Sequence, residues 1–259
     1  MITAGTDIGS LSVESVIFEA DRGMLGYSIV LTGANSRKSS EVSLEQALSS
    51  GRVKRTDVSY IVSTGCGREI SGFADESITE ITCLAKGVHY LFPDCRTIID
   101  IGGQDTKVIN VDERGRVTGF DMNDKCAAGT GRFLEVMAMA LNVDLEAMGE
   151  RSLHFKEDIE ISSLCTVFAE SEVVSLVSEG REVEDILHAL NKAVADRTVS
   201  LLERGRPEGK MAMTGGVAKN LGVVRAIEER LGKSMMVYHE PQIVGALGAA
   251  LIAKERMER

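Results

Sequence analysis

The sequence is short of prolines, cysteines and long apolar runs, and each shortage excludes a class of protein. Three prolines in 259 residues, with no low-complexity tract, leave no candidate for a flexible linker. The longest apolar candidate, at 243–253, falls well short of the roughly 20 residues that a membrane span needs. No basic start leads into an apolar core at the N-terminus, so we expect no secretory signal. The five cysteines follow no regular framework, which favours a reducing cytoplasm over a disulfide scaffold.

Positive charge is also scarce. The chain has 29 Lys and Arg against 39 Asp and Glu, a net charge of -10, whereas nucleic-acid binding normally leaves a basic footprint. A hydrophobic content of 44% in 259 residues is enough to bury a sizeable core, in one large or two modest domains. We therefore expect a soluble acidic protein that has neither nucleic acid nor a membrane as partner.

The common nucleotide-binding loops are missing as well. There is no G-x-x-x-x-G-K-[ST] loop and no complete G-x-G-x-x-G, so neither a P-loop nor a Rossmann site is supported. The segment "MTGGVAKN" at 213–220 lies between a predicted strand and a predicted helix, where paired glycines let backbone approach a nucleotide. Alone, this is a weak signal.

What the sequence does contain is one turn motif twice. "DIG" occurs at 7–9 and at 100–102, each time between predicted strands. The first half is predicted to contain strands at 2–6, 12–18, 27–31 and 58–64 and helices at 44–48 and 79–91. The second half is predicted to contain strands at 97–100, 107–111, 116–121, 211–213 and 235–238 and helices at 130–141, 182–202, 221–231 and 243–253.

Such a turn can serve phosphate chemistry. Its glycine lets backbone N–H groups approach phosphate oxygens, and its carboxylate can hold Mg²⁺ directly or through water. Either turn alone could equally be an ordinary hairpin. Two copies, Asp7 and Asp100 each opening one half of the chain, favour a pair of phosphate-binding turns.

Two cysteines sit in similar local settings. Cys126 and Cys165 each precede a predicted helix, and a helix N-terminus favours the thiolate that ligates metals. Two thiolates are too few for a four-cysteine cluster, but a twofold dimer would supply four. Buried packing remains an open alternative for both, and zinc competes with iron. We interpret the remaining cysteines as small buried hydrophobic residues, namely Cys66, Cys83 and Cys95.

Five segments in order resemble the actin, Hsp70 and sugar-kinase ATPase superfamily: "TDIGS", "TEITCLAKGV", "DIGGQDTK", "MTGGVAKN" and "EPQIVGALGAAL". The resemblance implies an α/β, duplicated two-lobed, actin-like (ribonuclease H-like) fold with the nucleotide in the interlobe cleft. The first ATPase lobe would comprise 1–95 plus 241–259. The second, 96–240, would carry the cluster cysteines. The small residues of "GALGAAL" predict close helix packing.

Two further segments are more specific. "NDKCAAGTGRFLEVMA" at 123–138 and "CTVFAESEVVSL" at 165–176 resemble the activator component of 2-hydroxyacyl-CoA dehydratases and the related ATPase subunits of benzoyl-CoA reductases. That family implies an ATPase of anaerobic metabolism coupled to electron transfer. It also implies a homodimer sharing one 4Fe-4S cluster on Cys126 and Cys165, an iron–sulfur acyl-CoA dehydratase or reductase as electron acceptor, and ferredoxin or flavodoxin as donor. A small-metabolite kinase and a scaffold ATPase remain rivals, and neither needs iron.

The same resemblance assigns the ATP chemistry, with ATP/ADP and Mg²⁺ as cofactors. Asp7 and Asp100 would organise Mg²⁺, and Gln104 would contact the terminal phosphate. Glu80 would orient the attacking water, although a solvent-facing helix glutamate is an equal alternative. The residues expected against the nucleotide are Gly9, Ser10, Ser12, Gly102, Gly103, Gly215, Gly216, Lys219 and Asn220. The first turn departs from the family pattern, because Leu11 and Glu14 stand where a hydroxyl residue and a lysine are usual.

Overall fold

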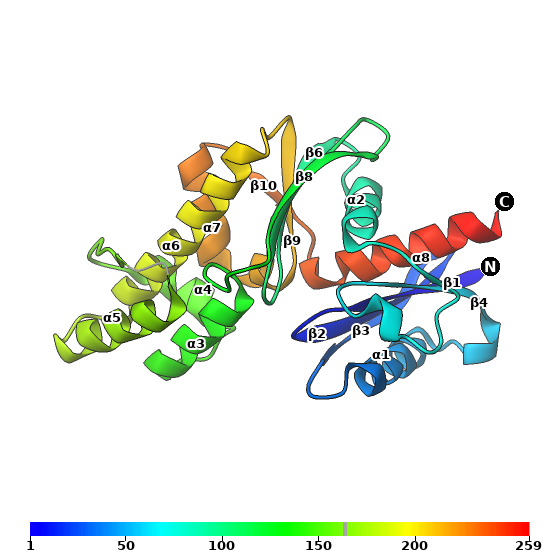
Figure 1. Cartoon of the computed structure of the whole chain (residues 1–259), viewed down its shortest axis with the longest axis horizontal. Coiled ribbons are helices and arrows are strands. Elements are labelled where there is room, and N and C mark those ends of the chain that lie inside the picture. Colours follow the sequence, from blue (N-terminus) through cyan, green and yellow to red (C-terminus); the bar gives the residue numbers. More distant parts are fainter. Residues whose placement is uncertain (163–164, 259) are drawn as a thin grey trace. The chain divides into compact units, whose positions relative to one another are not determined.

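The computed structural model describes residues 1–162 and 165–258, which form two five-stranded sheets with helices packed against them (Figure 1). The strand order of the first sheet is β3-β2-β1-β4-β5, and that of the second is β10-β9-β6-β7-β8. Read from β8, the second sheet repeats the order of the first: three strands consecutive in the chain, then two later ones. This repeat confirms the duplicated α/β fold that the superfamily resemblance implies.

The strands are β1 (Ile2–Ile8), β2 (Ser12–Glu19), β3 (Gly23–Leu31), β4 (Val58–Thr64), β5 (Glu76–Ser77), β6 (Cys95–Ile101), β7 (Thr106–Val111), β8 (Val117–Asn123), β9 (Lys210–Thr214) and β10 (Met235–Val237). The helices are α1 (Ser36–Gly51), α2 (Glu80–Leu91), α3 (Gly131–Leu141), α4 (Met148–Arg151), α5 (Thr166–Ser178), α6 (Val183–Arg204), α7 (Leu221–Leu231) and α8 (Val244–Met257).

The chain divides into two compact units. The first comprises Met1–Ile98, Ile109–Gly119 and the described part of Tyr238–Arg259, and the second comprises Ile99–Val108 and Phe120–Val237. The lobe boundaries expected from the sequence, 1–95 plus 241–259 and 96–240, stay a prediction, and residue 259 lies outside the described residues.

In the first unit, β1 and β2 pair as an antiparallel hairpin and β4 runs parallel to β1. Side chains alternate across such a sheet, so each face takes its own helix. Leu44 and Leu48 of α1 pack with Ile17 on one face. On the other face, α8 packs against Val16 and Phe18 of β2.

The packing of α8 on α2 is unusually close, as "GALGAAL" predicts. A Cβ atom added at Gly248 would lie 1.8 Å from the carbonyl oxygen of Cys83, and one at Gly87 would lie 2.3 Å from that of Val244. Only hydrogen at these positions allows the two helix backbones to touch. The prediction of close helix packing is confirmed.

Among the described residues of the second unit, strands and the five helices α3 to α7 contribute side chains to one large core. Phe133 and Met137 of α3, Leu187 and Leu190 of α6, and Met213 of β9 are at most 2% exposed within it. In Figure 1, α6 and α7 run side by side, and α3 lies against α5. This core fixes the start of α3 and the end of β9, which carry predicted site segments.

The sequence located the longer elements and missed the shortest. The helix expected at 44–48 extends over Ser36–Gly51, because the Asn35 side chain caps it by accepting from the Lys38 N–H. Neither α4 nor β5 was predicted, since four and two residues are too few to display a period. Across the part of the chain that the structure describes, no helix combines the length and the apolar character needed to cross a membrane.

Candidate functional site

The first of the two turns predicted to bind phosphate, residues 7–12 and called here the first phosphate turn, joins β1 to β2. The N–H of Gly9 donates to the Ser12 carbonyl at 3.0 Å, which closes the turn just after Asp7. Asp7 itself is 8% exposed, whereas Ser10 faces solvent. The sequence-predicted Asp7, Gly9, Ser10 and Ser12 therefore lie together in one short hairpin.

Gln242, in the segment before α8, forms hydrogen bonds with residues at and beyond the end of this turn. Its Nε2 donates to Ser12 Oγ and to Glu14 Oε1, each at 2.8 Å. A hydroxyl that accepts a bond from an amide keeps its own proton to donate elsewhere. Ser12 is thereby oriented as a hydrogen-bond donor, the role that a phosphate oxygen requires.

Glu14 adds a second carboxylate beside the turn. It is 4% exposed and lies directly opposite Asp7 in the β1–β2 register. Its hydrogen bond from Gln242 gives the buried carboxylate a polar partner, as burial of a charged group requires. Glu14, which stands where the resembled family usually has a lysine, is thus a buried and hydrogen-bonded residue of this chain.

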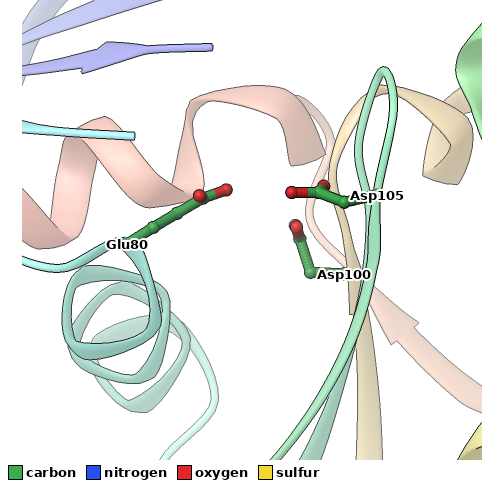
Figure 2. Close-up of side chains that lie close together, drawn as sticks. All are labelled: Glu80, Asp100 and Asp105. Carbon is green, nitrogen blue, oxygen red and sulfur yellow. The ribbon is translucent and has the colours of Figure 1, made fainter. Parts of the chain in front are cut away.

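The second phosphate turn, between β6 and β7, has Lys107 at the position where the first has Glu14. The N–H of Gly102 donates to the Asp105 carbonyl at 3.0 Å, which closes it. The Lys107 ammonium lies 2.8 Å from Asp105 Oδ1 and 3.4 Å from Asp100 Oδ2, and the lysine side chain is only 2% exposed. Figure 2 shows the Asp100 and Asp105 side chains extending from this strand pair. Gln104, at the tip, is exposed.

Thr214 connects this turn to the "MTGGVAKN" segment. Its hydroxyl donates to Asp100 Oδ1 at 2.8 Å and so fixes the carboxylate from β9. Gly215 follows with a φ of 84°, and a Cβ there would lie 2.3 Å from the Ile101 carbonyl oxygen. The backbone can occupy this position only without a side chain. Asp100 and Gly215, predicted separately, meet here.

In the rest of the "MTGGVAKN" segment, some predicted site residues are exposed and one is buried. Gly216 and Lys219 are exposed. Asn220, in contrast, is 9% exposed; its Oδ1 accepts from the Val223 N–H and caps α7, and its Nδ2 donates to Asn191 Oδ1 at 3.3 Å. Asn220 thus holds α7 and α6 together.

Glu80 is the first residue of α2 and is partly exposed; Figure 2 labels it on that helix. A carboxylate in the first turn of a helix is favoured by the helix dipole. This local preference accounts for an acidic residue at the position, and the role of Glu80 in orienting water stays a prediction.

The two candidate ligand cysteines are both exposed. Cys126 lies in the loop from β8 to α3, and Cys165 is the N-cap residue of α5. The expected position at a helix start therefore holds for Cys165, whereas Cys126 lies in the loop before α3, which begins at Gly131. Thiols are the ligands that iron–sulfur clusters use, so the donor set fits such a group. Since one chain offers two of them, a four-thiolate site needs a second chain.

Of the three remaining cysteines, two are buried and one is exposed. Cys83 and Cys95 are buried, as interpreted, and burial raises the pKa of the Cys83 thiol to about 12. The interpretation of Cys66 was wrong, because its side chain is exposed. Gly65, immediately before it, has a φ of 86°, and Cys66 lies in the turn that follows the end of β4 at Thr64.

Sequence reasoning missed four side chains of these turns: Asp105, Lys107, Thr214 and Gln242. Alignment of the two "DIG" turns carried a signal for one of them, since Lys107 follows Asp100 at the distance at which Glu14 follows Asp7. Thr214 and Gln242 gave none, because they contact residues 114 and 230 positions away.

Comparison with known proteins places this geometry in context. The model of the BadF/BadG/BcrA/BcrD ATPase family matches residues 4–253. The chain is 46% identical, over 100% of both proteins, to a protein of Anaerotignum propionicum named activator of lactoyl-CoA dehydratase. It is 41% identical to the (R)-2-hydroxyglutaryl-CoA dehydratase activating ATPase of Acidaminococcus fermentans, over 98% of this chain and 97% of that protein. The structure of the activator of the 2-hydroxyisocaproyl-CoA dehydratase from Clostridium difficile with bound ADPNP superposes with a TM-score of 0.96, at 42% identity, over 100% of this chain and 96% of that one.

Proposed function

Since the chain belongs to the BadF/BadG/BcrA/BcrD ATPase family, we propose that it is an ATP-hydrolysing iron–sulfur activator that transfers a low-potential electron to a 2-hydroxyacyl-CoA dehydratase. The observation that carries this proposal is similarity along the whole chain to two proteins named as activators of such dehydratases, at 46% and 41% identity. The exposed thiols of Cys126 and Cys165 support the iron–sulfur part.

The ATP chemistry is assigned to the two turns. Asp7 and Asp100 supply carboxylate oxygens, the ligands that Mg²⁺ prefers, and Thr214 holds Asp100 in place. The turns that contain Gly9, Gly102 and Gly103 are assigned to the phosphate oxygens, and the N–H groups of Gly9 and Gly102 hold these turns closed through the Ser12 and Asp105 carbonyls. Ser10 and Ser12 add hydroxyl donors.

The remaining residues of the proposed nucleotide site have more limited roles. Gln104 is assigned to the terminal phosphate and Glu80 to the attacking water. The backbone of Gly215 and Gly216, with Lys219 and Asn220 nearby, is assigned to the adenosine part. Phosphoryl transfer depends mainly on such positioning and charge neutralisation.

The electron site is assigned to Cys126 and Cys165 of each of two chains. When bound, a 4Fe-4S cluster supplies a centre that gains and loses one electron at a time. The chain's own contribution is a pair of thiols, one of which, Cys165, caps the start of α5, where the helix dipole favours negative charge. We propose a homodimer for this reason, because four thiolates require two copies.

The proposed partners follow from this chemistry. Reduced ferredoxin or flavodoxin is the donor, and an iron–sulfur acyl-CoA dehydratase is the acceptor. We expect the protein to work in the cytoplasm, where cysteines stay reduced. An ATPase subunit of a benzoyl-CoA reductase and a small-metabolite kinase are less supported, because both relatives described above are named for dehydratases.

An iron and sulfide assay on anaerobically purified protein tests the proposal. We expect about four iron atoms per two chains, near-complete loss of iron in Cys126→Ala, and retained ATP binding in that variant. Cys66→Ala is the matched control, since Cys66 is also exposed and should leave the iron content unchanged. Iron-free wild-type protein after reconstitution, or full iron in Cys126→Ala, would contradict the assignment.

A further inference from the structure

The second phosphate turn and the start of α3 are joined by three hydrogen bonds within the second unit. The N–H of Gly131 donates to the Gly102 carbonyl and that of Arg132 to the Gly103 carbonyl, both at 2.9 Å. The Thr130 hydroxyl also donates to the Gly103 carbonyl, at 3.0 Å. The first N–H groups of a helix have no partner inside it, and here the phosphate turn supplies two.

These bonds connect the turn to a segment that begins at Cys126. Gly131 lies so close to the turn that a Cβ on it would be 3.3 Å from the Gly102 carbonyl oxygen. Cys126 precedes Thr130 by four residues. A displacement of the turn must therefore either move the start of α3 or break one of the three bonds.

Thr130 is the one of the three donors that has a choice of acceptor. Its hydroxyl lies 3.0 Å from the Gly103 carbonyl oxygen and 2.7 Å from the carbonyl oxygen of Ala127, the residue after Cys126. A hydroxyl has a single proton to donate. Bonding to Gly103 and bonding to Ala127 are therefore alternatives.

The burial of Thr130 limits its hydroxyl to these two acceptors, the Gly103 and Ala127 carbonyl oxygens. The residue is fully buried, so water cannot substitute for either acceptor. Each carbonyl also keeps one backbone donor, Arg132 N–H on Gly103 and Thr130 N–H on Ala127, and neither is left unsatisfied when the hydroxyl turns away. A switch requires two discrete arrangements, and the two acceptors of the Thr130 hydroxyl provide them.

We propose that Thr130 is a positioning residue that couples the phosphate turn to the cysteine loop, by donating its hydroxyl proton either to Gly103 or to Ala127. The inference rests on the proposed function, because it assumes that nucleotide phosphates shift the turn. Through this hydrogen bond, ATP and ADP would have different effects on the conformation of the loop that carries Cys126.

The test measures the reactivity of Cys126 in the full-length protein before iron is added. The rate of Cys126 alkylation is followed by peptide mass spectrometry with no nucleotide, with ADP and with a non-hydrolysable ATP analogue. One neutral hydrogen bond changes a two-state equilibrium by about 2- to 10-fold, so a rate change of that size is expected between nucleotide states.

Three variants separate coupling from packing. Thr130→Val keeps the shape and removes the hydroxyl, and it should reduce the nucleotide response to below about twofold while ATP affinity changes little. Thr130→Ser keeps the hydroxyl and should restore the response. Thr198→Val is the matched control, because it removes another buried threonine hydroxyl, bonded to the Val194 carbonyl within α6, and should leave the response intact.

Iron release to a chelator from the reconstituted protein gives a second readout, which should respond to nucleotide in the wild type and not in Thr130→Val. Should Thr130→Val fold poorly, Thr130→Ala provides the same comparison. A full response in either folded hydroxyl-free variant, or no response in wild type that binds ATP, would overturn the inference alone. Wild-type protein that binds no nucleotide would instead contradict the proposed function.

Discussion

Lys107 is the residue on which the charge balance of the second phosphate turn depends. Its buried ammonium lies between Asp100 and Asp105. Removing one partner of a buried ion pair leaves the other charge uncompensated, at a cost of roughly 3 kcal/mol. Lys107→Met should therefore lower the free energy of unfolding by about that amount, measured by urea denaturation.

The double variant Lys107→Met with Asp100→Asn provides the control. Because the second substitution removes the stranded charge, it should recover part of the lost stability. Strictly additive costs of the two substitutions would show that the 3.4 Å contact between Lys107 and Asp100 carries no energy.

Cys83 should be the least reactive thiol among those described. Burial raises its pKa to about 12, so at pH 9 it remains a protonated thiol, and the reagent cannot reach it. Iodoacetamide applied to the native, iron-free protein should label the exposed Cys66, Cys126 and Cys165 and spare Cys83 and Cys95. In urea all five should react. Labelling of Cys83 at the rate of Cys66 in native protein would refute this burial.

Single residues also show where prediction from sequence ends. Asp7, Asp100 and the two cysteine motifs could be selected because each stands in a local pattern that sequence displays. Thr214 and Gln242 could not, since each contacts a residue far away in the chain. The interpretation of Cys66 as buried was wrong, because it lies in the turn after β4.

At the scale of elements, the close contact of α8 with α2 is the packing feature most sensitive to substitution. Gly248→Ala would place a methyl group 1.8 Å from the Cys83 carbonyl oxygen, so one helix must shift. Overpacking of this kind costs about 1–3 kcal/mol, which urea denaturation of the variant should detect.

Gly72→Ala is the matched control for that substitution, because nothing lies within 4 Å of a Cβ at Gly72. Its stability should be unchanged or slightly higher, since alanine restricts the unfolded chain. Equal stability of Gly248→Ala and Gly72→Ala would mean that α2 and α8 are not held in the contact described.

Elements were predicted well where period and length were sufficient. The hydrophobic spacing along 182–202 and 221–231 identified α6 and α7, and the bounds of α7 are those observed. The first strand of each repeat was also found. What periodicity could not supply was the bonding of the α3 start to the phosphate turn, because the Gly102 and Gly103 carbonyls carry no sequence signal.

For the whole molecule, the duplicated fold was predictable because five segments in order resemble a known ATPase superfamily, and the repeated "DIG" turn agrees with a duplication. The matching strand orders of the two sheets bear this out. The proposed iron centre was inferred differently, because one chain supplies only two of the four thiolates proposed as its ligands. Its assignment depends on the motifs around Cys126 and Cys165 together with the requirement for a second copy.

The most direct test of the account is electron transfer from the reduced, iron-loaded protein to a purified 2-hydroxyacyl-CoA dehydratase, with and without MgATP. Oxidation of the donor is followed by its absorbance, and ADP formation is measured in the same sample. We predict transfer and ADP formation together when ATP is present, and neither when a non-hydrolysable analogue replaces it. Equal transfer without ATP, or ATP hydrolysis with no electron reaching the dehydratase, would contradict the account.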